Sequence, residues 1–179
     1  MPLPTAIPAD FSWMKNMSRL QKFLFPDINL KLMIRVGLVA LVAISCFTWI
    51  LIPFRINGYS MEPTYQNGSF NFCNRLHYFF SSPSHSDVVA IRYAGTRVML
   101  LKRVLAVEEE TLEFRNGQLF VDGKPVPEPY VVNPYDWNLE PRTVNPGHVY
   151  VVGDNRQVPM LNHDFGQTLI KRIAGAPLW

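Results

Sequence analysis

The sequence predicts a mainly β domain that follows one N-terminal membrane-spanning helix. Three observations lead to this fold class. The chain of 179 residues is 48% hydrophobic but only 17% charged, and much of its apolar content lies in a single stretch near the N-terminus. Beyond Arg55 the pattern changes to short alternating runs, and the 15 prolines fit a loop-rich β domain better than a helical bundle.

The apolar stretch runs from Val36 to Phe54 and contains no charged side chain. A helix of about 20 residues crosses a hydrocarbon core of about 30 Å. Arg35 and Arg55 flank the stretch, and Trp49 suits a membrane interface. A buried core helix and a cleavable signal peptide are the alternatives, but no small-x-small cleavage site follows this run. We therefore expect a segment 1–35, a permanent transmembrane helix 36–54 and a domain 55–179.

The charges that precede the span predict its orientation. Five basic residues oppose two acidic ones there: Lys15, Arg19, Lys22, Lys31 and Arg35 against Asp10 and Asp27. The positive-inside rule places the N-terminus in the cytoplasm and the domain on the outer, periplasmic face of the cell (inner) membrane. Apolar residues at helical spacing between Phe11 and Phe25 fit a helix on the cytoplasmic surface or a partly ordered tail.

Strand candidates in the domain come from apolar alternation and turn residues. They are the segments 86–91, 98–101, 111–114, 118–121 and 149–152. Asn116-Gly117 between the third and fourth predicts a tight hairpin, and Gly153-Asp154-Asn155 closes the last. Since no amphipathic helical repeat follows residue 80, the domain is expected to be mainly β.

Cysteines and histidines give no indication of a metal or cofactor. Cys46 lies in the apolar stretch and Cys73 beyond it, so a disulfide between them is not expected. The four histidines are scattered without ligand spacing, and we expect no metal site and no cofactor. A net charge of +3 without a long basic run gives no reason to expect nucleic-acid binding.

Two segments hold residues with catalytic potential. Ser60 lies in Gly58-Tyr59-Ser60-Met61-Glu62-Pro63-Thr64, where glycine and proline favour a rigid turn, although most such segments are ordinary turns. Lys102 stands in the apolar run 100–104. Burial would lower the pKa of this lysine, and a neutral lysine can serve as the base that a serine hydroxyl needs. A strand that is solvent-exposed at Lys102 is the alternative.

Together with Gly153-Asp154-Asn155-Arg156, these segments resemble the type I signal peptidase family. Ser60-Met61-Glu62-Pro63-Thr64 matches its SMxPT box, Lys102-Arg103 its KR box, and residues 153–156 its GDNR box. The family's DVV strand matches residues 87–89, and its Glu-Pro-Tyr matches residues 128–130. The resemblance extends from the anchor to the C-terminus.

The resemblance implies a β-rich membrane serine protease that cleaves signal peptides from exported preproteins. Ser60 would be its nucleophile and Lys102 its general base, supported by Arg103 and Asp154. Substrates would bind as an extended strand against residues 55–58 and 99–101. The expected substrate-binding residues are Ile56, Gly58, Met99 and Leu101.

The chain departs from the family pattern in three places, the first being Ala106 and Glu108-Glu109-Glu110 where the family has a glycine and a Pro-Gly-Asp turn. After the GDNR box the family commonly has a serine that orients the lysine; a gapped alignment puts Asn162 and Asp164 in place of that Ser-x-Asp, whereas an ungapped one loses it. Gly58 stands where some members have a serine in the oxyanion hole. A peptidase dedicated to one exported partner, such as a pilin or conjugation protein, and a catalytically silent peptide-binding module remain alternatives. The sequence does not predict an oligomeric state.

Overall fold

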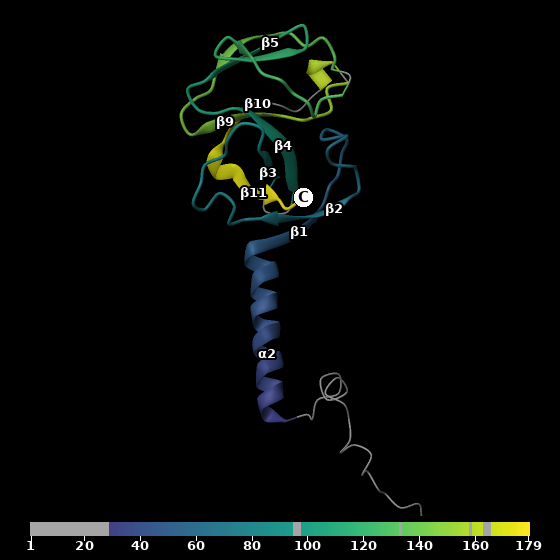
Figure 1. The fold of residues 1–179 in the computed structure, drawn as a ribbon, viewed down its shortest axis with the longest axis vertical. Helices are drawn as coiled ribbons and strands as arrows, with labels where there is room; N and C mark the ends of the chain where they lie inside the picture. The colour runs from purple at the N-terminus through teal and green to yellow at the C-terminus, as the bar shows by residue number, and fades with distance from the viewer. Residues whose placement is uncertain (1–28, 95–97, 133, 158, 163–165) are drawn as a thin grey trace, which may run out of the picture. The chain divides into compact units, whose positions relative to one another are not determined.

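The computed structural model describes residues 29–94, 98–132, 134–157, 159–162 and 166–179. The chain forms two units, Met1–Ile44 and Ser45–Trp179. The expected surface helix between Phe11 and Phe25 lies outside the described residues. Among those described, the secondary structure of the second unit is mostly β-strand, as predicted (Figure 1).

Helix α2 (Leu30–Ser45) continues as a π-helical turn, Cys46–Ile50. Asn29 caps its start, where its side-chain oxygen accepts a hydrogen bond of 2.9 Å from the backbone N–H of Leu32. By length and composition, Leu30–Ile50 could cross a membrane. The helix therefore begins and ends earlier than the predicted 36–54.

Residues expected to complete the helix form strand β1 (Leu51–Arg55) instead. Pro53 explains the change, because proline disfavours a helical conformation at the residue before it and cannot donate a helical hydrogen bond. A sheet tolerates proline on an edge strand, and β1 is the edge of a seven-stranded sheet.

That sheet has the order β1-β2-β11-β3-β4-β9-β10. Its other strands are β2 (Phe70–Asn74), β3 (Val88–Ala94), β4 (Val98–Ala106), β9 (His148–Val152), β10 (Gly166–Leu169) and β11 (Ile173–Pro177). All neighbours pair antiparallel. Strand β4 lies between β3 and β9, so it is hydrogen-bonded on both sides.

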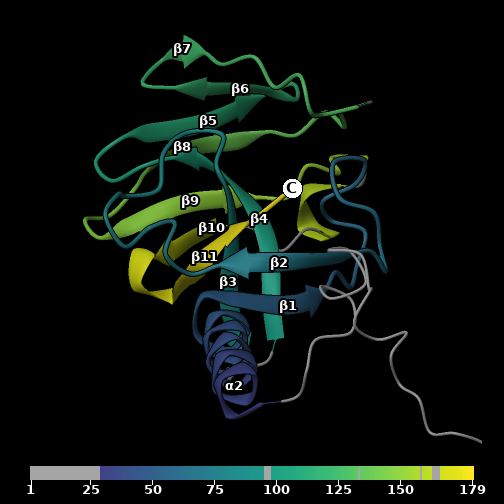
Figure 2. The same ribbon diagram turned by 60° about the horizontal axis from the view of Figure 1, so that its bottom comes forward.

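A second sheet has the order β7-β6-β5-β8, which Figure 2 shows side by side. Its strands are β5 (Thr111–Arg115), β6 (Gln118–Val121), β7 (Lys124–Pro125) and β8 (Leu139–Thr143). The predicted hairpin is confirmed: Asn116 and Gly117 connect β5 to β6 with φ values of 49° and 79°. Two short 3-10 helices, Met160–Asn162 and Ile170–Arg172, complete the described elements.

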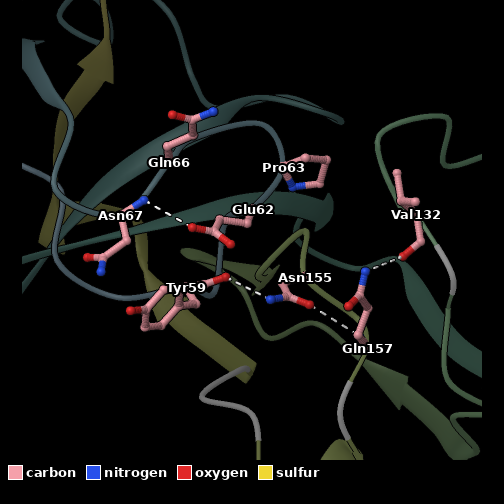
Figure 3. Close-up of a pocket in the computed structure, with 8 residues that line it drawn as sticks. All are labelled: Tyr59, Glu62, Pro63, Gln66, Asn67, Val132, Asn155 and Gln157. Atoms are coloured by element: carbon pink, nitrogen blue, oxygen red, sulfur yellow. Dashed lines mark hydrogen bonds between the residues drawn. The ribbon is translucent and has the colours of Figure 1, made fainter.

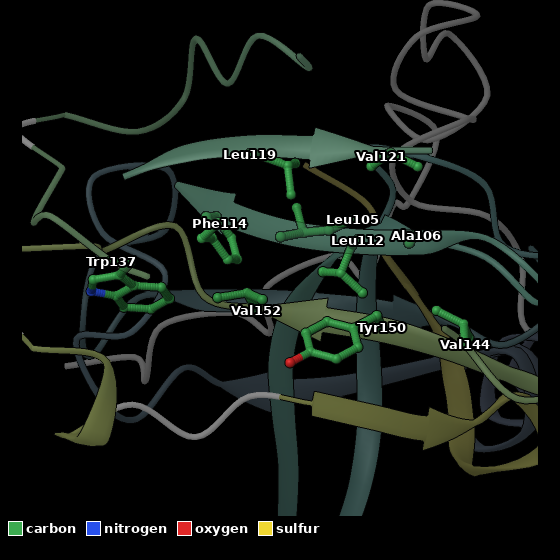
Figure 4. Close-up of a cluster of buried hydrophobic side chains, with 10 residues drawn as sticks. All are labelled: Leu105, Ala106, Leu112, Phe114, Leu119, Val121, Trp137, Val144, Tyr150 and Val152. Atoms are coloured by element: carbon green, nitrogen blue, oxygen red, sulfur yellow. The ribbon is translucent and has the colours of Figure 1, made fainter. Parts of the chain in front are cut away.

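Three hydrophobic clusters form the core. The largest joins the two sheets, where side chains of β5 and β6 pack against the end of β4 and against β9 (Figure 4). Phe114 and Trp137 meet there edge to face, with ring centroids 5.6 Å apart. A second cluster contains Ile56, Met61 and Leu101 and supports the candidate active site.

Candidate active site

Ser60 lies in a turn shortly after β1 and is half-buried. The turn is closed by a hydrogen bond of 3.2 Å from the N–H of Glu62 to the carbonyl oxygen of Tyr59. Met61 is buried in the core beside Ile56 and Leu101, which fixes the position of its neighbour Ser60. Ser60 thus lies on a well-supported turn, accessible on one side.

Lys102 is buried, with only 4% of its surface exposed. It stands in the middle of β4 opposite Val89 of β3, and every residue from 101 to 106 is buried. The exposed-strand alternative is therefore excluded. Taking an ammonium out of water is costly, so a lysine this buried is either paired or held neutral, and the neutral amine is the form that a general base requires.

The expected substrate-binding residues meet beside Ser60. Ile56, Gly58, Met99 and Leu101 line a small pocket together with Ser60 and Met61. Leu101 directly precedes Lys102 on β4, so the backbone of the lysine adjoins the residues that line this pocket. Residues some 40 positions apart in the sequence form one recess, lined mostly by residues with apolar side chains, next to a hydroxyl group.

A buried ion pair lies directly beside this strand. Arg103 donates two hydrogen bonds to Asp154, from Nε to Oδ1 at 2.8 Å and from Nη2 to Oδ2 at 2.6 Å. Its Nη1 also donates to the carbonyl oxygen of Ser86, and its guanidinium lies 3.9 Å from the centre of the Tyr130 ring. Burial lowers the pKa of Arg103, but hydrogen bonding and attraction to Asp154 outweigh it and raise that pKa, so the guanidinium stays charged.

Asp154 also connects the arginine to the serine turn. Its Oδ2 accepts a hydrogen bond of 2.5 Å from Oγ1 of Thr64. Its neighbour Asn155 donates from the backbone to the carbonyl oxygen of Ser60 and from the side chain to that of Tyr59, both at 3.0 Å. The three matched boxes are therefore joined by direct hydrogen bonds. Sequence reasoning missed Thr64 and Asn155, although both lie inside those boxes.

A second buried ion pair, between Arg156 and Glu128, stabilises the GDNR turn. Arg156 is 2% exposed, and its Nη2 donates to Glu128 Oε1 at 2.7 Å while its Nε donates to the carbonyl oxygen of Gly153. Its guanidinium lies near the rings of Phe114 and Trp137. Sequence reasoning gave no role to Glu128 or Arg156, because nothing local indicates that they pair.

The structure gives less information on the two remaining supporting residues, Asn162 and Asp164. Asn162 is exposed at the end of a 3-10 helix, and its backbone N–H donates to the carbonyl oxygen of Pro159. Asp164 lies outside the described residues. Their expected part in orienting Lys102 stays a prediction. Within the described part of the chain, no group of three or more His, Cys, Asp or Glu residues could hold a metal ion.

Comparison with known proteins gives a consistent result. Residues 29–160 match the model of the family described as signal peptidase, peptidase S26. The chain is 31% identical over 154 residues to signal peptidase I V of Bacillus subtilis, covering 78% of this chain and 91% of that protein. It is 33% identical over 135 residues to thylakoidal processing peptidase 1 of Arabidopsis thaliana, covering 69% of this chain but 39% of the relative.

A solved structure of a signal peptidase I from Enterococcus faecalis also matches, with a TM-score of 0.42 and 22% identity. The match covers 54% of this chain and 97% of the bacterial one. The chain spans less than two fifths of the length of the two plant peptidases that it matches, at 39% and 36%.

Proposed function

Because the chain belongs to the peptidase S26 family of signal peptidases, we propose that it is a membrane-bound serine endopeptidase that removes signal peptides from exported preproteins. The observation that carries the proposal is the recess in which Ser60 meets Ile56, Gly58, Met99 and Leu101, together with the burial of Lys102 on the same strand as Met99 and Leu101. This arrangement provides a nucleophile, a candidate base and a place for a peptide.

The proposed reaction is peptide hydrolysis through an acyl-enzyme. Neutral Lys102 takes the proton from Ser60 Oγ, which attacks the scissile carbonyl carbon and forms a tetrahedral intermediate. As the peptide bond breaks, the ammonium of Lys102 gives its proton to the leaving amine. Water, again deprotonated by Lys102, then hydrolyses the ester and restores Ser60.

Backbone N–H groups would stabilise the oxyanion. The N–H of Ser60 is the first candidate, because Gly58 offers no side-chain donor where some relatives have serine. Gly58 has a φ of 111°, a conformation that L side chains rarely adopt, and a Cβ there would meet no atom within 4 Å. The turn therefore leaves open space beside Gly58, where no hydroxyl donor is present.

The recess supports a preference for small apolar side chains before the scissile bond. Ile56 and Leu101 are buried and only partly available to a ligand, and the pocket is small, about 20 Å³, so it has little room for a large side chain. Discrimination by such a pocket is modest, about 1–3 kcal/mol per methylene. We propose small residues at the first and third positions before the cleaved bond.

The bilayer is the second proposed partner. Support comes from the span Leu30–Ile50 and from the strand register that follows it. Asn74, the last residue of β2, pairs with Leu51, and the N–H of Arg75 donates to the carbonyl oxygen of Ile50. The loop 75–86 therefore starts beside the end of the span.

This loop carries two exposed aromatic rings. Phe79 is 70% exposed and Phe80 is 91% exposed. The loop is compact, because the N–H of Phe79 donates to the carbonyl oxygen of Leu76 and the Ser81 hydroxyl to that of His77. Aromatic rings are favoured at the membrane interface, so we propose that the loop tip rests in the lipid headgroup region.

We further propose that the N-terminus is cytoplasmic and that the domain lies on the outer, periplasmic face of the cell membrane. The excess of basic residues before the span supports this orientation. Protease added to intact spheroplasts should digest the domain after Arg55, whereas protection until lysis would contradict the topology.

The test of function is cleavage of a preprotein by the full-length protein in detergent or liposomes. The wild type should release the signal peptide, and Ser60→Ala should reduce the rate by several orders of magnitude. Cleavage that survives Ser60→Ala would refute the proposed nucleophile. A panel of unrelated preproteins separates a general enzyme from one dedicated to a single exported partner, which would cleave only that substrate. Failure with every substrate would favour a silent peptide-binding module.

A further inference from the structure

A second recess near Ser60 has a different chemistry. Its volume is about 550 Å³, within the range of ligand sites. It is lined by Tyr59, Glu62, Pro63, Gln66, Asn67, Val132, Asn155 and Gln157 (Figure 3). We propose that this pocket receives the substrate residues that follow the scissile bond, and that Glu62 makes it prefer basic over acidic side chains there. The inference rests on the proposed peptidase function.

The residues of the serine turn divide between the two pockets. Gly58, Ser60 and Met61 line the apolar recess, whereas Tyr59 and Glu62 line the second pocket. An extended peptide advances about 3.3 Å per residue, so a chain whose scissile carbonyl is at Ser60 must continue past the turn. If the residues before the bond occupy the apolar recess, the next two or three residues enter the second pocket.

Hydrogen bonds hold the walls of this pocket in place. Glu62 Oε1 accepts from the N–H of Asn67 at 3.2 Å, and the Asn155 side chain donates to the carbonyl oxygen of Tyr59 (Figure 3). The N–H of Gln157 donates to Asn155 Oδ1, and its side chain reaches the carbonyl oxygen of Val132 at 3.5 Å. These bonds join three separate segments, so the pocket is formed before a substrate arrives.

The charge of the pocket determines which residues it favours. Glu62 is the one charged side chain among the described residues that line it; the others are amides, an aromatic ring, a proline and a valine. A carboxylate at the wall attracts a lysine or arginine and repels a glutamate. Because the pocket is open to solvent, the effect resembles that of an exposed ion pair, about two- to fivefold in rate constant for each partner of opposite charge.

The experiment compares preproteins that differ only in the first three residues after the scissile bond, which are lysine, serine or glutamate. The full-length wild type should cleave the lysine substrate with a kcat/KM at least fivefold above that of the glutamate substrate. Glu62→Gln should remove most of this preference, and Glu62→Lys should invert it. The preference should shrink as ionic strength rises.

Two further variants keep the test decisive. Gln157→Lys adds a cation to the opposite wall and should shift the preference toward glutamate without changing Glu62. Glu140→Lys makes the same charge change as Glu62→Lys, but on exposed strand β8 and away from the residues that line both pockets. It should leave the preference as it is. Equal cleavage of all three substrates by the wild type, or a preference that Glu62→Lys leaves unchanged, would overturn the inference while cleavage itself persists. Loss of cleavage in every variant, the wild type included, would instead overturn the proposed function and the inference with it.

Discussion

Lys102 differs from an ordinary strand lysine by its burial, since only 4% of its surface reaches solvent. Lys102→Arg keeps the charge and approximate length but introduces a group that stays protonated in proteins. We expect Lys102→Arg to lose signal-peptide cleavage as completely as Lys102→Ala, measured as kcat/KM on a preprotein. Lys171→Arg, at an exposed position, is the matched control and should be near the wild type.

An active Lys102→Arg variant would mean that Lys102 contributes only a positive charge and that another residue is the general base. His163 would then be the next residue to replace, since it follows the GDNR box and an imidazole titrates near neutral pH.

Cys73 is a second residue whose chemistry follows from burial. It is fully buried in β2, and desolvation raises the pKa of its thiol from 9.0 to about 11, although Arg75 and Arg92 act in the opposite direction. Two pKa units make the reactive thiolate about 100-fold scarcer at neutral pH. In a Cys46→Ala background, iodoacetamide should therefore modify Cys73 slowly in the folded protein and rapidly in urea.

The same shift has a consequence for stability. The folded state holds the Cys73 proton more tightly than the unfolded state, so this contribution is complete below pH 9.0 and is lost as the pH rises toward about 11. Cys73→Ala should remove this part of the alkaline loss of stability. An equally steep loss in that variant would assign the effect to other groups.

At the scale of elements, the Arg103–Asp154 pair joins β4 to the turn after β9. Asp154→Ala leaves a buried guanidinium without its carboxylate, which typically costs about 3–5 kcal/mol. We expect a clear fall in the thermal unfolding midpoint in detergent. The double variant Arg103→Met/Asp154→Leu should lose less, because no uncompensated charge remains.

The Arg115–Glu113 pair provides the control. Arg115 is largely exposed, and such a pair contributes about 0–1 kcal/mol, so Glu113→Ala should barely change the midpoint. If Asp154→Ala had an equally small effect, the buried pair would not be what holds the site together.

The molecule as a whole is expected to contact the bilayer at a second place besides its helix. A nitroxide attached to a Phe80→Cys variant in liposomes, with Cys46 replaced by alanine, should collide more with lipid-soluble oxygen than with a water-soluble nickel chelate. Lys124→Cys, on exposed strand β7, should show the opposite ratio. If the ratio of oxygen to nickel-chelate collisions were equal at the two positions, the loop would not contact the membrane surface.

Local patterns determined a large part of this architecture. The charge-free run predicted a spanning helix, and Asn116-Gly117 predicted a hairpin, because hydropathy and turn geometry act over a few residues. The matched boxes in order predicted the family. The predicted helix ended at Phe54, whereas the observed one ends at Ile50. Hydropathy does not distinguish the two outcomes, because residues 51–54 are apolar whether they extend the helix or form strand β1.

Only the tertiary structure decided how the boxes meet. Strand β4 lies between β3 and β9, and its residues 101–106, Lys102 included, are all buried, which the neighbours of Lys102 in sequence do not specify. Thr64 and Asp154 share a hydrogen bond across 90 positions, and Glu128 pairs with Arg156 across 28. Local sequence can present a serine, a lysine and an aspartate in separate turns and strands. Their assembly depends on long-range strand pairing and shared burial, which act between segments that the chain alone does not bring together.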